Sequence, residues 1–159
     1  MPEPYHLQRP EKEIKDKAEI CQIIREQAFM TLAMSMGDRP YLVTMNYGFD
    51  EQNNCLYFHC ANEGKKLDFL KNNPLIWGQI IENRGYVVGE CSHAYRCIEF
   101  GGTVDFLQNF EEKKHALDLM IDHIEPDPEP LKKRMVNEKR ILGVTIGRIN
   151  LQQITGKKN

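Results

Sequence analysis

Two adjacent lysines stand where a predicted strand passes into a predicted helix. Lys65 and Lys66 follow Gly64, the alternating strand pattern ends at His59-Cys60, and leucines at helical spacing come next. Cations are unfavourable at a helix N-terminus, because the helix dipole is positive there and the first amides are unpaired. A phosphate would satisfy both the amides and the ammonium groups. Since helices also begin with exposed lysines that bind nothing, this stretch alone leaves a phosphate site and a solvated helix start equally open.

Cysteine and histidine side chains offer a second chemistry, a metal site. Thiolate and imidazole groups suit zinc or iron, and five residues could supply them: His59, Cys60, Cys91, His93 and Cys97. Their spacing matches no standard zinc pattern, and buried thiols are common where the compartment is reducing. A nucleophilic pair of Cys60 and His59 is also disfavoured, because neighbouring strand residues point to opposite faces. We therefore predict no metal ligands and keep a metal–thiolate protein as an alternative.

Alternating and helical apolar patterns predict an α+β protein. Strands are predicted at 29–36, 39–47, 55–60, 75–82, 86–91, 98–106 and 141–154. Helices are predicted at 14–28, 65–72, 109–124 and 131–138. Antiparallel sets of this number commonly close into a barrel, which removes exposed edges. We therefore expect a small barrel with helices inserted after the third and the sixth strand.

Local signals add detail to these elements. Asn109 is expected to cap the helix that follows it. Residues 83–85 read as a turn, and the prolines of 125–130 predict an extended linker. Gly101-Gly102 predicts a bend or bulge within a strand, and the apolar phase slips at Gly147-Arg148, which predicts a second bulge.

The first three strands are joined by short polar turns, which predicts a meander. Thr44 and Asn46 would then lie on the strand next to that of His59. A flat ring system along this strand could bond to its backbone and to those two side chains, whose alternative role is a solvated outer face. Apolar cover for such a ring could come from Met45, Tyr47 or Trp77.

Composition limits the classes of function. The 159 residues fit one domain over 14–159, preceded by a Pro- and charge-rich arm at 1–13. A net charge of -2 gives no general attraction to nucleic acid or to an anionic membrane. No apolar run reaches the roughly 18 residues of a membrane span, and no signal-peptide core is present at the start. We expect a cytoplasmic protein whose five cysteines are thiols.

Several of these stretches combine into a pattern that resembles a known family. They are Arg39-Pro40-Tyr41, Asn46-Tyr47, the HxAxxGxK segment from His59 to Lys66, Tyr95-Arg96-Cys97 and the helix at Glu111-Glu112-Lys113. From Ile14 to Ile124 the chain is similar to the pyridoxamine 5'-phosphate oxidase-like FMN-binding split barrels. Within them it is closest to the branch of the nitroimidazole-resistance (Nim-type) flavoproteins.

The resemblance implies a six-stranded antiparallel split β-barrel with flanking helices, and a homodimer with FMN at the subunit interface. Carried over by position, Lys65 and Lys66 would hold the FMN phosphate, and Gly64 would let the backbone approach it. The remaining implied contacts are Val43, Thr44, Met45 and Asn46 along the ring, His59 and Ala61 beside the ribityl chain or ring, and Tyr95 and Arg96 toward a flavin. Two positions depart from the pattern, Thr44 where proline is common and Cys97 where serine is common.

The resemblance leads to an expected function, an FMN-dependent oxidoreductase that reduces a small nitroaromatic or quinone-like electrophile. NAD(P)H or another reductant would supply the electrons, and His59 is the candidate for proton transfer. The vitamin B6 substrate pattern is not recognisable in the C-terminal third of the chain. The alternatives are a flavin- or haem-binding module without turnover, and the metal–thiolate protein described above.

Overall fold

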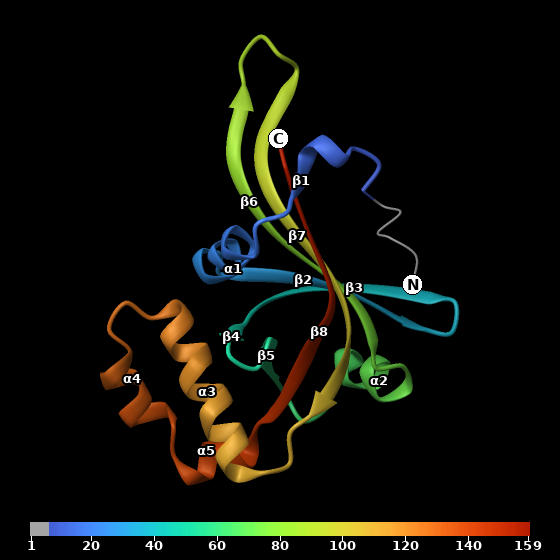
Figure 1. The fold of residues 1–159 in the computed structure, drawn as a ribbon. Coiled ribbons are helices and arrows are strands. Elements are labelled where there is room, and N and C mark those ends of the chain that lie inside the picture. Colours follow the sequence, from blue (N-terminus) through green and yellow to red (C-terminus); the bar gives the residue numbers. More distant parts are fainter. Residues whose placement is uncertain (1–6) are drawn as a thin grey trace.

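The computed structural model describes residues 7–159, in which eight strands form one antiparallel sheet that curls without closing (Figure 1). The strand order is β3-β2-β6-β7-β8-β5-β4, and β1 pairs with the end of β8. The strands are β1 (Glu13–Ile14), β2 (Phe29–Met36), β3 (Arg39–Asn46), β4 (Gly48–Asp50), β5 (Cys55–Cys60), β6 (Leu75–Val87), β7 (Ser92–Phe106) and β8 (Thr145–Lys158). The expected α+β class and split-barrel architecture are confirmed, with eight strands instead of six. The expected N-terminal arm lies partly outside the described residues, at 1–6.

Five α-helices and one 3-10 helix of the described residues surround the sheet. They are η1 (Pro10–Lys12), α1 (Lys17–Glu26), α2 (Lys65–Asn72), α3 (Phe110–Ile124), α4 (Pro128–Met135) and α5 (Glu138–Gly143). Asn109 caps α3 as expected, because its side-chain oxygen accepts from the amides of Glu111 and Glu112. Within residues 7–159, no helix is both long and apolar enough to pass through a bilayer.

The predicted meander is wrong. β3 pairs with β2, whereas β5 pairs with β4 and β8, so β3 and β5 are not neighbours in the sheet. The reason lies just after Asn46, where buried Tyr47 donates to the carbonyls of Ile24 and Gln27. Gly48 then packs so closely on α3 that a Cβ there would lie 2.7 Å from the Met120 amide nitrogen. These contacts carry the chain from the β2 side of the sheet to its other end.

The β6–β7 hairpin is longer than predicted. β6 continues through the expected turn at 83–85, where the pairing with β7 only shifts register between Asn83 and Tyr86. Gly85 has a φ of +97°, which lets the backbone bulge and then resume pairing. The true turn lies at 88–91, and the hairpin extends away from the rest of the fold (Figure 1).

The C-terminal region differs from expectation in three ways. The predicted linker at 125–130 ends early, because Pro128 begins α4, and a proline is tolerated in a first helical turn whose amides are unpaired anyway. β8 begins at Thr145, and pairing runs unbroken through Gly147 and Arg148, so no bulge lies there. The irregularity falls opposite Gly101 and Gly102 instead, as those two glycines predicted, and it leaves Gln152 unpaired.

The main core fills the inside of the curled sheet. Apolar side chains of α1 and α2 join those of β2, β5, β6 and β7 there, among them Ile23, Phe58, Phe69 and Phe100. A smaller cluster lies under α3. The outer face of β3, β2 and β6 carries exposed apolar side chains, among them Phe29, Leu42 and Trp77. This arrangement fixes α2, and with it the lysine pair, against the end of the sheet.

Candidate functional site

The start of α2 has the properties expected of an anion site. Gly64 precedes the helix with φ +131° and ψ 168°, a conformation that is essentially restricted to glycine. No side chain caps the helix, so its first amides have no capping acceptor. A Cβ at Gly64 would meet nothing within 4 Å, so the backbone conformation and not crowding accounts for the glycine.

Aromatic rings surround the two lysines. The Lys65 ammonium lies 4.4 Å from the Tyr41 ring centroid and 5.6 Å from that of Phe69. The Lys66 ammonium lies 5.9 Å from the Phe58 ring centroid. Within residues 7–159, neither ammonium forms an ion pair with a carboxylate. Both charges therefore remain available to an anion.

His59 and Cys60 lie at the end of β5, beside Lys66. The pKa of His59 is lowered, first by partial desolvation of its ring and then by the Lys66 ammonium. Burial raises the pKa of the Cys60 thiol, while Lys66 and Lys71 act in the opposite direction. His59 is exposed and is therefore an imidazole that stays neutral at neutral pH and is accessible from outside.

The loop before α2 is held from the C-terminal side of the chain. The Asn62 side chain donates to the Gly143 carbonyl at 2.9 Å and accepts from the Thr145 hydroxyl at 2.7 Å. The neighbouring residue Ala61 is exposed. Asn62 thus ties the loop to the junction between α5 and β8, a contact that spacing along the sequence does not reveal.

The residues expected to line a ring are divided between the two faces of β3. Val43 and Met45 are half-buried and pack against the main core. Thr44 and Asn46 are exposed on the outer face, where Thr44 shares a hydrogen bond with Thr31 and the Asn46 amide donates to the Ala28 carbonyl. β3 approaches the lysines through Tyr41, which contacts Lys65. The sequence pattern included Tyr41 in Arg39-Pro40-Tyr41 but gave it no part in the site.

Tyr95 and Arg96 lie elsewhere in the chain. Arg96 is buried on β7, with its guanidinium held by Glu82, Glu26 and Glu19. Thr103, on the same strand, pairs with Leu75 just after α2. Seven residues separate Arg96 from Thr103, about 23 Å along a strand. Within one chain, Arg96 is therefore remote from Lys65, and its contact with a flavin stays a prediction.

The predicted apolar cover of a ring and the metal–thiolate alternative both involve residues away from the start of α2. The Tyr47 ring is fully buried and its hydroxyl is engaged, so it cannot cover a ligand, whereas Trp77 is exposed on the outer sheet face. Among residues 7–159, no three metal-ligating side chains gather. Cys91 lies exposed in the hairpin turn. Cys97 is buried in β7 opposite Lys157 of β8, whereas Cys60 of β5 lies opposite Thr145, near the other end of the same strand, so these side chains do not come together within one chain.

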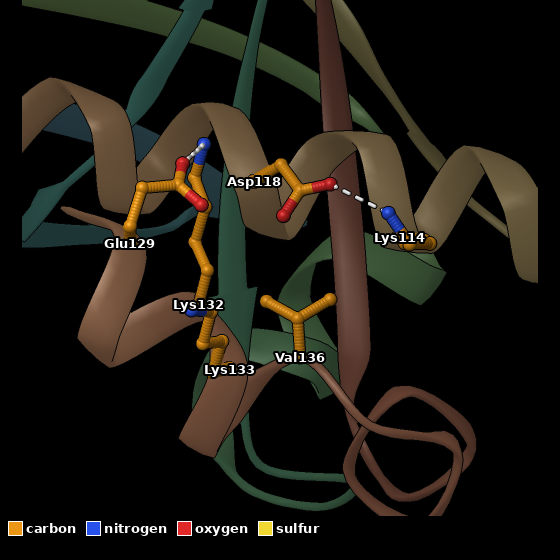
Figure 2. Close-up of a pocket in the computed structure, with 6 residues that line it drawn as sticks. All are labelled: Lys114, Asp118, Glu129, Lys132, Lys133 and Val136. Carbon is orange, nitrogen blue, oxygen red and sulfur yellow. Dashed lines mark hydrogen bonds and ion pairs between the residues drawn. The ribbon is translucent and has the colours of Figure 1, made fainter.

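A shallow pocket between α3 and α4 contains none of the predicted site residues. It measures about 310 Å³ and is lined by Lys114, Asp118, Glu129, Lys132, Lys133 and Val136. Figure 2 shows two of its lysines paired with carboxylates of the same pocket, Lys114 with Asp118 and Lys132 with Glu129. Lys132 also contacts Asp122 at 2.7 Å. The pair of Lys132 and Asp122 attaches α4 to α3, so the pairing of Lys132 serves the packing of these helices.

Comparison with known proteins identifies the family and the fold of the chain. The family model described as pyridoxamine 5'-phosphate oxidase matches residues 16–158. No curated protein sequence matches the chain.

Solved structures with the same fold include proteins described as binding flavin. A candidate 5-nitroimidazole antibiotic resistance protein from Bacteroides thetaiotaomicron is 28% identical, with a TM-score of 0.78 over 92% of this chain and 86% of that one. The FAD and heme binding protein from Mycobacterium smegmatis is 14% identical, with a TM-score of 0.78 over 93% and 73%. An FAD-binding protein from Mesorhizobium loti is 18% identical, with a TM-score of 0.66 over 91% and 95%.

Proposed function

This chain belongs to the pyridoxamine 5'-phosphate oxidase family, and on that premise we propose that it is an FMN-binding oxidoreductase. The observation that carries the proposal is the start of α2, where two ammonium groups that pair with no carboxylate of residues 7–159 stand beside amides that no side chain of this range caps. A terminal monophosphate matches this group of donors, because charge-assisted bonds to phosphate are stronger than neutral ones. Lys65 and Lys66 bind that phosphate. The positive φ of Gly64, which glycine adopts without strain, lets the backbone reach it.

The position of β3 supports a ring beside this phosphate. β3 is the end strand of the sheet, and among residues 7–159 it pairs only with β2, so its other edge presents backbone donors and acceptors that no described strand occupies. The backbone of Val43, Thr44, Met45 and Asn46 can bond to the polar edge of an isoalloxazine. Tyr41, on the same strand, already contacts Lys65, which links the ring-binding strand to the phosphate-binding helix.

FMN supplies the electron transfer, and the protein supplies binding, orientation and proton exchange. His59 is the candidate for exchanging a proton with the substrate, because it is exposed, lies beside Lys66 and has a lowered pKa. A neutral imidazole at neutral pH accepts a proton through one ring nitrogen and releases one from the other. We propose a small nitroaromatic or quinone-like electrophile as the acceptor and NAD(P)H as a reductant, consistent with the 28%-identical structure described above.

The outer sheet face supports a homodimer with FMN at the interface. Phe29, Leu42 and Trp77 are exposed there, with Ile81 on the same face, and Leu42, Ala33 and Trp77 stand side by side across three strands. Exposed apolar groups gathered on one sheet face are typical of a surface that another molecule covers. A second copy related by a two-fold axis is the commonest such partner.

The homodimer is tested by charge insertion with a matched control. Leu42→Glu places a carboxylate on the outer face, whereas Leu142→Glu changes an equally exposed leucine of α5, both being 64% exposed. We expect Leu42→Glu to dissociate the dimer in sedimentation and to lower its flavin content, and Leu142→Glu to do neither. A wild-type monomer that retains flavin would refute the dimer.

The cofactor is tested by the absorbance spectrum of the purified protein and by mass spectrometry of the released ligand. FMN gives bands in the blue and near ultraviolet, whereas a haem module gives a Soret band. Reduction of the bound flavin by NAD(P)H, followed by reoxidation with a nitroaromatic or a quinone, would support turnover. A colourless protein with no affinity for added FMN would refute the proposed function.

A further inference from the structure

An aromatic pair holds one of the two lysines. Tyr41 of β3 and Phe69 of α2 have ring centroids 5.2 Å apart at an angle of 53°. The Lys65 ammonium lies against both rings, nearer to Tyr41 at 4.4 Å than to Phe69 at 5.6 Å. Lys66, in contrast, is nearest to Phe58 at 5.9 Å, near the outer limit of such contacts.

The Tyr41 ring is well placed to fix the ammonium. A cation is attracted to the face of an aromatic ring, and this offsets the repulsion of Lys65 by the positive end of the α2 dipole. Tyr41 itself is held, because its backbone pairs with Met34 and its ring packs partly against the main core. A free lysine samples many rotamers and loses that freedom when it binds a ligand. An ammonium already held over a fixed ring loses less.

We propose that Tyr41 is a positioning residue, which holds the Lys65 ammonium ready for the terminal phosphate of the ligand. The proposal rests on the proposed function and deepens it. It assigns part of the preference for a phosphorylated flavin over an unphosphorylated one to Tyr41, which does not touch the phosphate. Phe69 also contacts the Lys65 ammonium, but its ring is buried and packs in the main core, so changing it would also disturb the core. Tyr41 is only half-buried and its hydroxyl forms no hydrogen bond within residues 7–159, so the ring face is its functional part.

The test compares the dissociation constants of FMN and riboflavin, which differ only in the phosphate. We expect wild type to prefer FMN, and Tyr41→Leu to weaken FMN binding about two- to fivefold, the range of a partly exposed cation–π contact. Riboflavin affinity should not change. Tyr41→Phe retains the ring and should behave as wild type, a rescue that a role of the hydroxyl would not allow. Tyr41→Met, which retains apolar contact without an aromatic face, replaces the leucine variant if thermal unfolding shows that variant to be misfolded.

A double-mutant cycle separates positioning of Lys65 from direct contact with the ligand. In a Lys65→Met background, Tyr41→Leu should cause no further loss of FMN affinity, because its partner is gone. Equal losses of FMN and riboflavin, or additive effects in the cycle, would overturn the role of Tyr41 while leaving the phosphate site intact. A wild-type protein that binds both flavins equally would instead refute the proposed phosphate site itself, and with it this inference.

Discussion

Two groups of cationic side chains in this molecule differ in what surrounds them. Arg96 is 8% exposed, and its guanidinium contacts carboxylates from two different elements: Glu82 of β6, and Glu19 and Glu26 of α1. One nitrogen of Arg96 lies 3.1 Å from Glu82 and 3.2 Å from Glu26. This cluster attaches α1 to the β6–β7 hairpin, and its charges are satisfied inside the protein.

The surroundings of the lysines of α2 differ from those of Arg96. Lys65 and Lys66 lie against rings and not against carboxylates, and the amides next to them are uncapped. An aromatic face holds a cation weakly and leaves its hydrogen-bond donors free, whereas a carboxylate occupies them. A cation paired with carboxylates therefore stabilises the fold, and a cation held by rings remains able to bind an incoming anion.

The largest expected effect is on ligand affinity at the lysines. Changing both Lys65 and Lys66 to Ala should weaken FMN binding by several kcal/mol, since each charged contact contributes about 1.5–3 kcal/mol. Stability should change little, because neither ammonium forms an ion pair with a carboxylate of residues 7–159 and contacts of a cation with a partly exposed ring are weak. Fluorescence titration with FMN measures this, and Lys133→Ala/Arg134→Ala on exposed α4 is the matched control. An unchanged FMN affinity would place the phosphate elsewhere.

Arg96 should show the opposite result. Arg96→Met removes the buried cation that Glu82, Glu26 and Glu19 share, although Glu19 keeps its pair with Lys158. Loss of one partner of a buried ion pair costs about 3–5 kcal/mol of unfolding free energy. The preference for FMN over riboflavin should persist in the folded variant. Arg84→Met is the control, because Arg84 is exposed and its pair with Glu82, at 3.6 Å, is a weak surface pair. Denaturant unfolding measures both. If Arg96→Met were as stable as wild type, the guanidinium would not hold α1.

The same contrast explains what the sequence could predict. Gly64-Lys65-Lys66 is a local signal, since strand, turn and helix follow one another within 18 residues, and the structure has all three at 55–72. The cap at Asn109 is likewise local. Tyr41 and Lys65, however, are brought together by the curl of the sheet, and no periodicity connects them. The partners of Arg96 come from two elements for the same reason.

Errors in the predicted fold also follow from non-local contacts. Short polar turns favour hairpins, so β3 and β5 were expected to pair, but the packing of Gly48 on α3 redirects the chain. The prolines near Pro128 correctly excluded a helix interior, yet they are compatible with a first turn, which the pattern did not distinguish. Local chemistry therefore predicted the elements, and long-range packing decided their neighbours.

Gly64 offers a smaller effect within the anion site. Gly64→Ala forces a side chain into a backbone region that costs about 1–3 kcal/mol for residues other than glycine. Because the space around it is open, the cost comes from strain alone, and we expect either lower stability or a shifted loop that binds FMN less tightly. Gly143→Ala is the control, since that glycine also has open space but no positive φ. Thermal unfolding and FMN titration together separate the two outcomes. If Gly64→Ala changed neither the unfolding temperature nor the FMN affinity, the loop would adapt to the side chain without strain.

The smallest expected effect is a dependence of stability on pH that arises at Arg96. Hydrogen bonding to Arg96 lowers the pKa of Glu82, so the folded state binds this proton less readily than the unfolded state does. The stabilisation is therefore complete above the ordinary glutamate pKa of about 4.3 and is lost as the pH falls through the lower folded value. Burial raises the pKa of Asp50, but hydrogen bonds from Asn53 and His115 together outweigh burial and lower it, which adds a similar loss in acid.

A comparison of wild type with Arg96→Met isolates the first of these contributions, because Asp50 is present in both proteins. Without the guanidinium, Glu82, Glu26 and Glu19 repel one another, so their protonation should relieve strain in the variant as the pH falls. The difference in unfolding free energy between the two proteins should therefore shrink as the pH falls from 7 to about 2, by about 1.4 kcal/mol for each unit of pKa shift. Urea unfolding across that range measures the difference. A gap that stayed constant would show that Arg96 stabilises the protein through packing of its side chain and not through its charge.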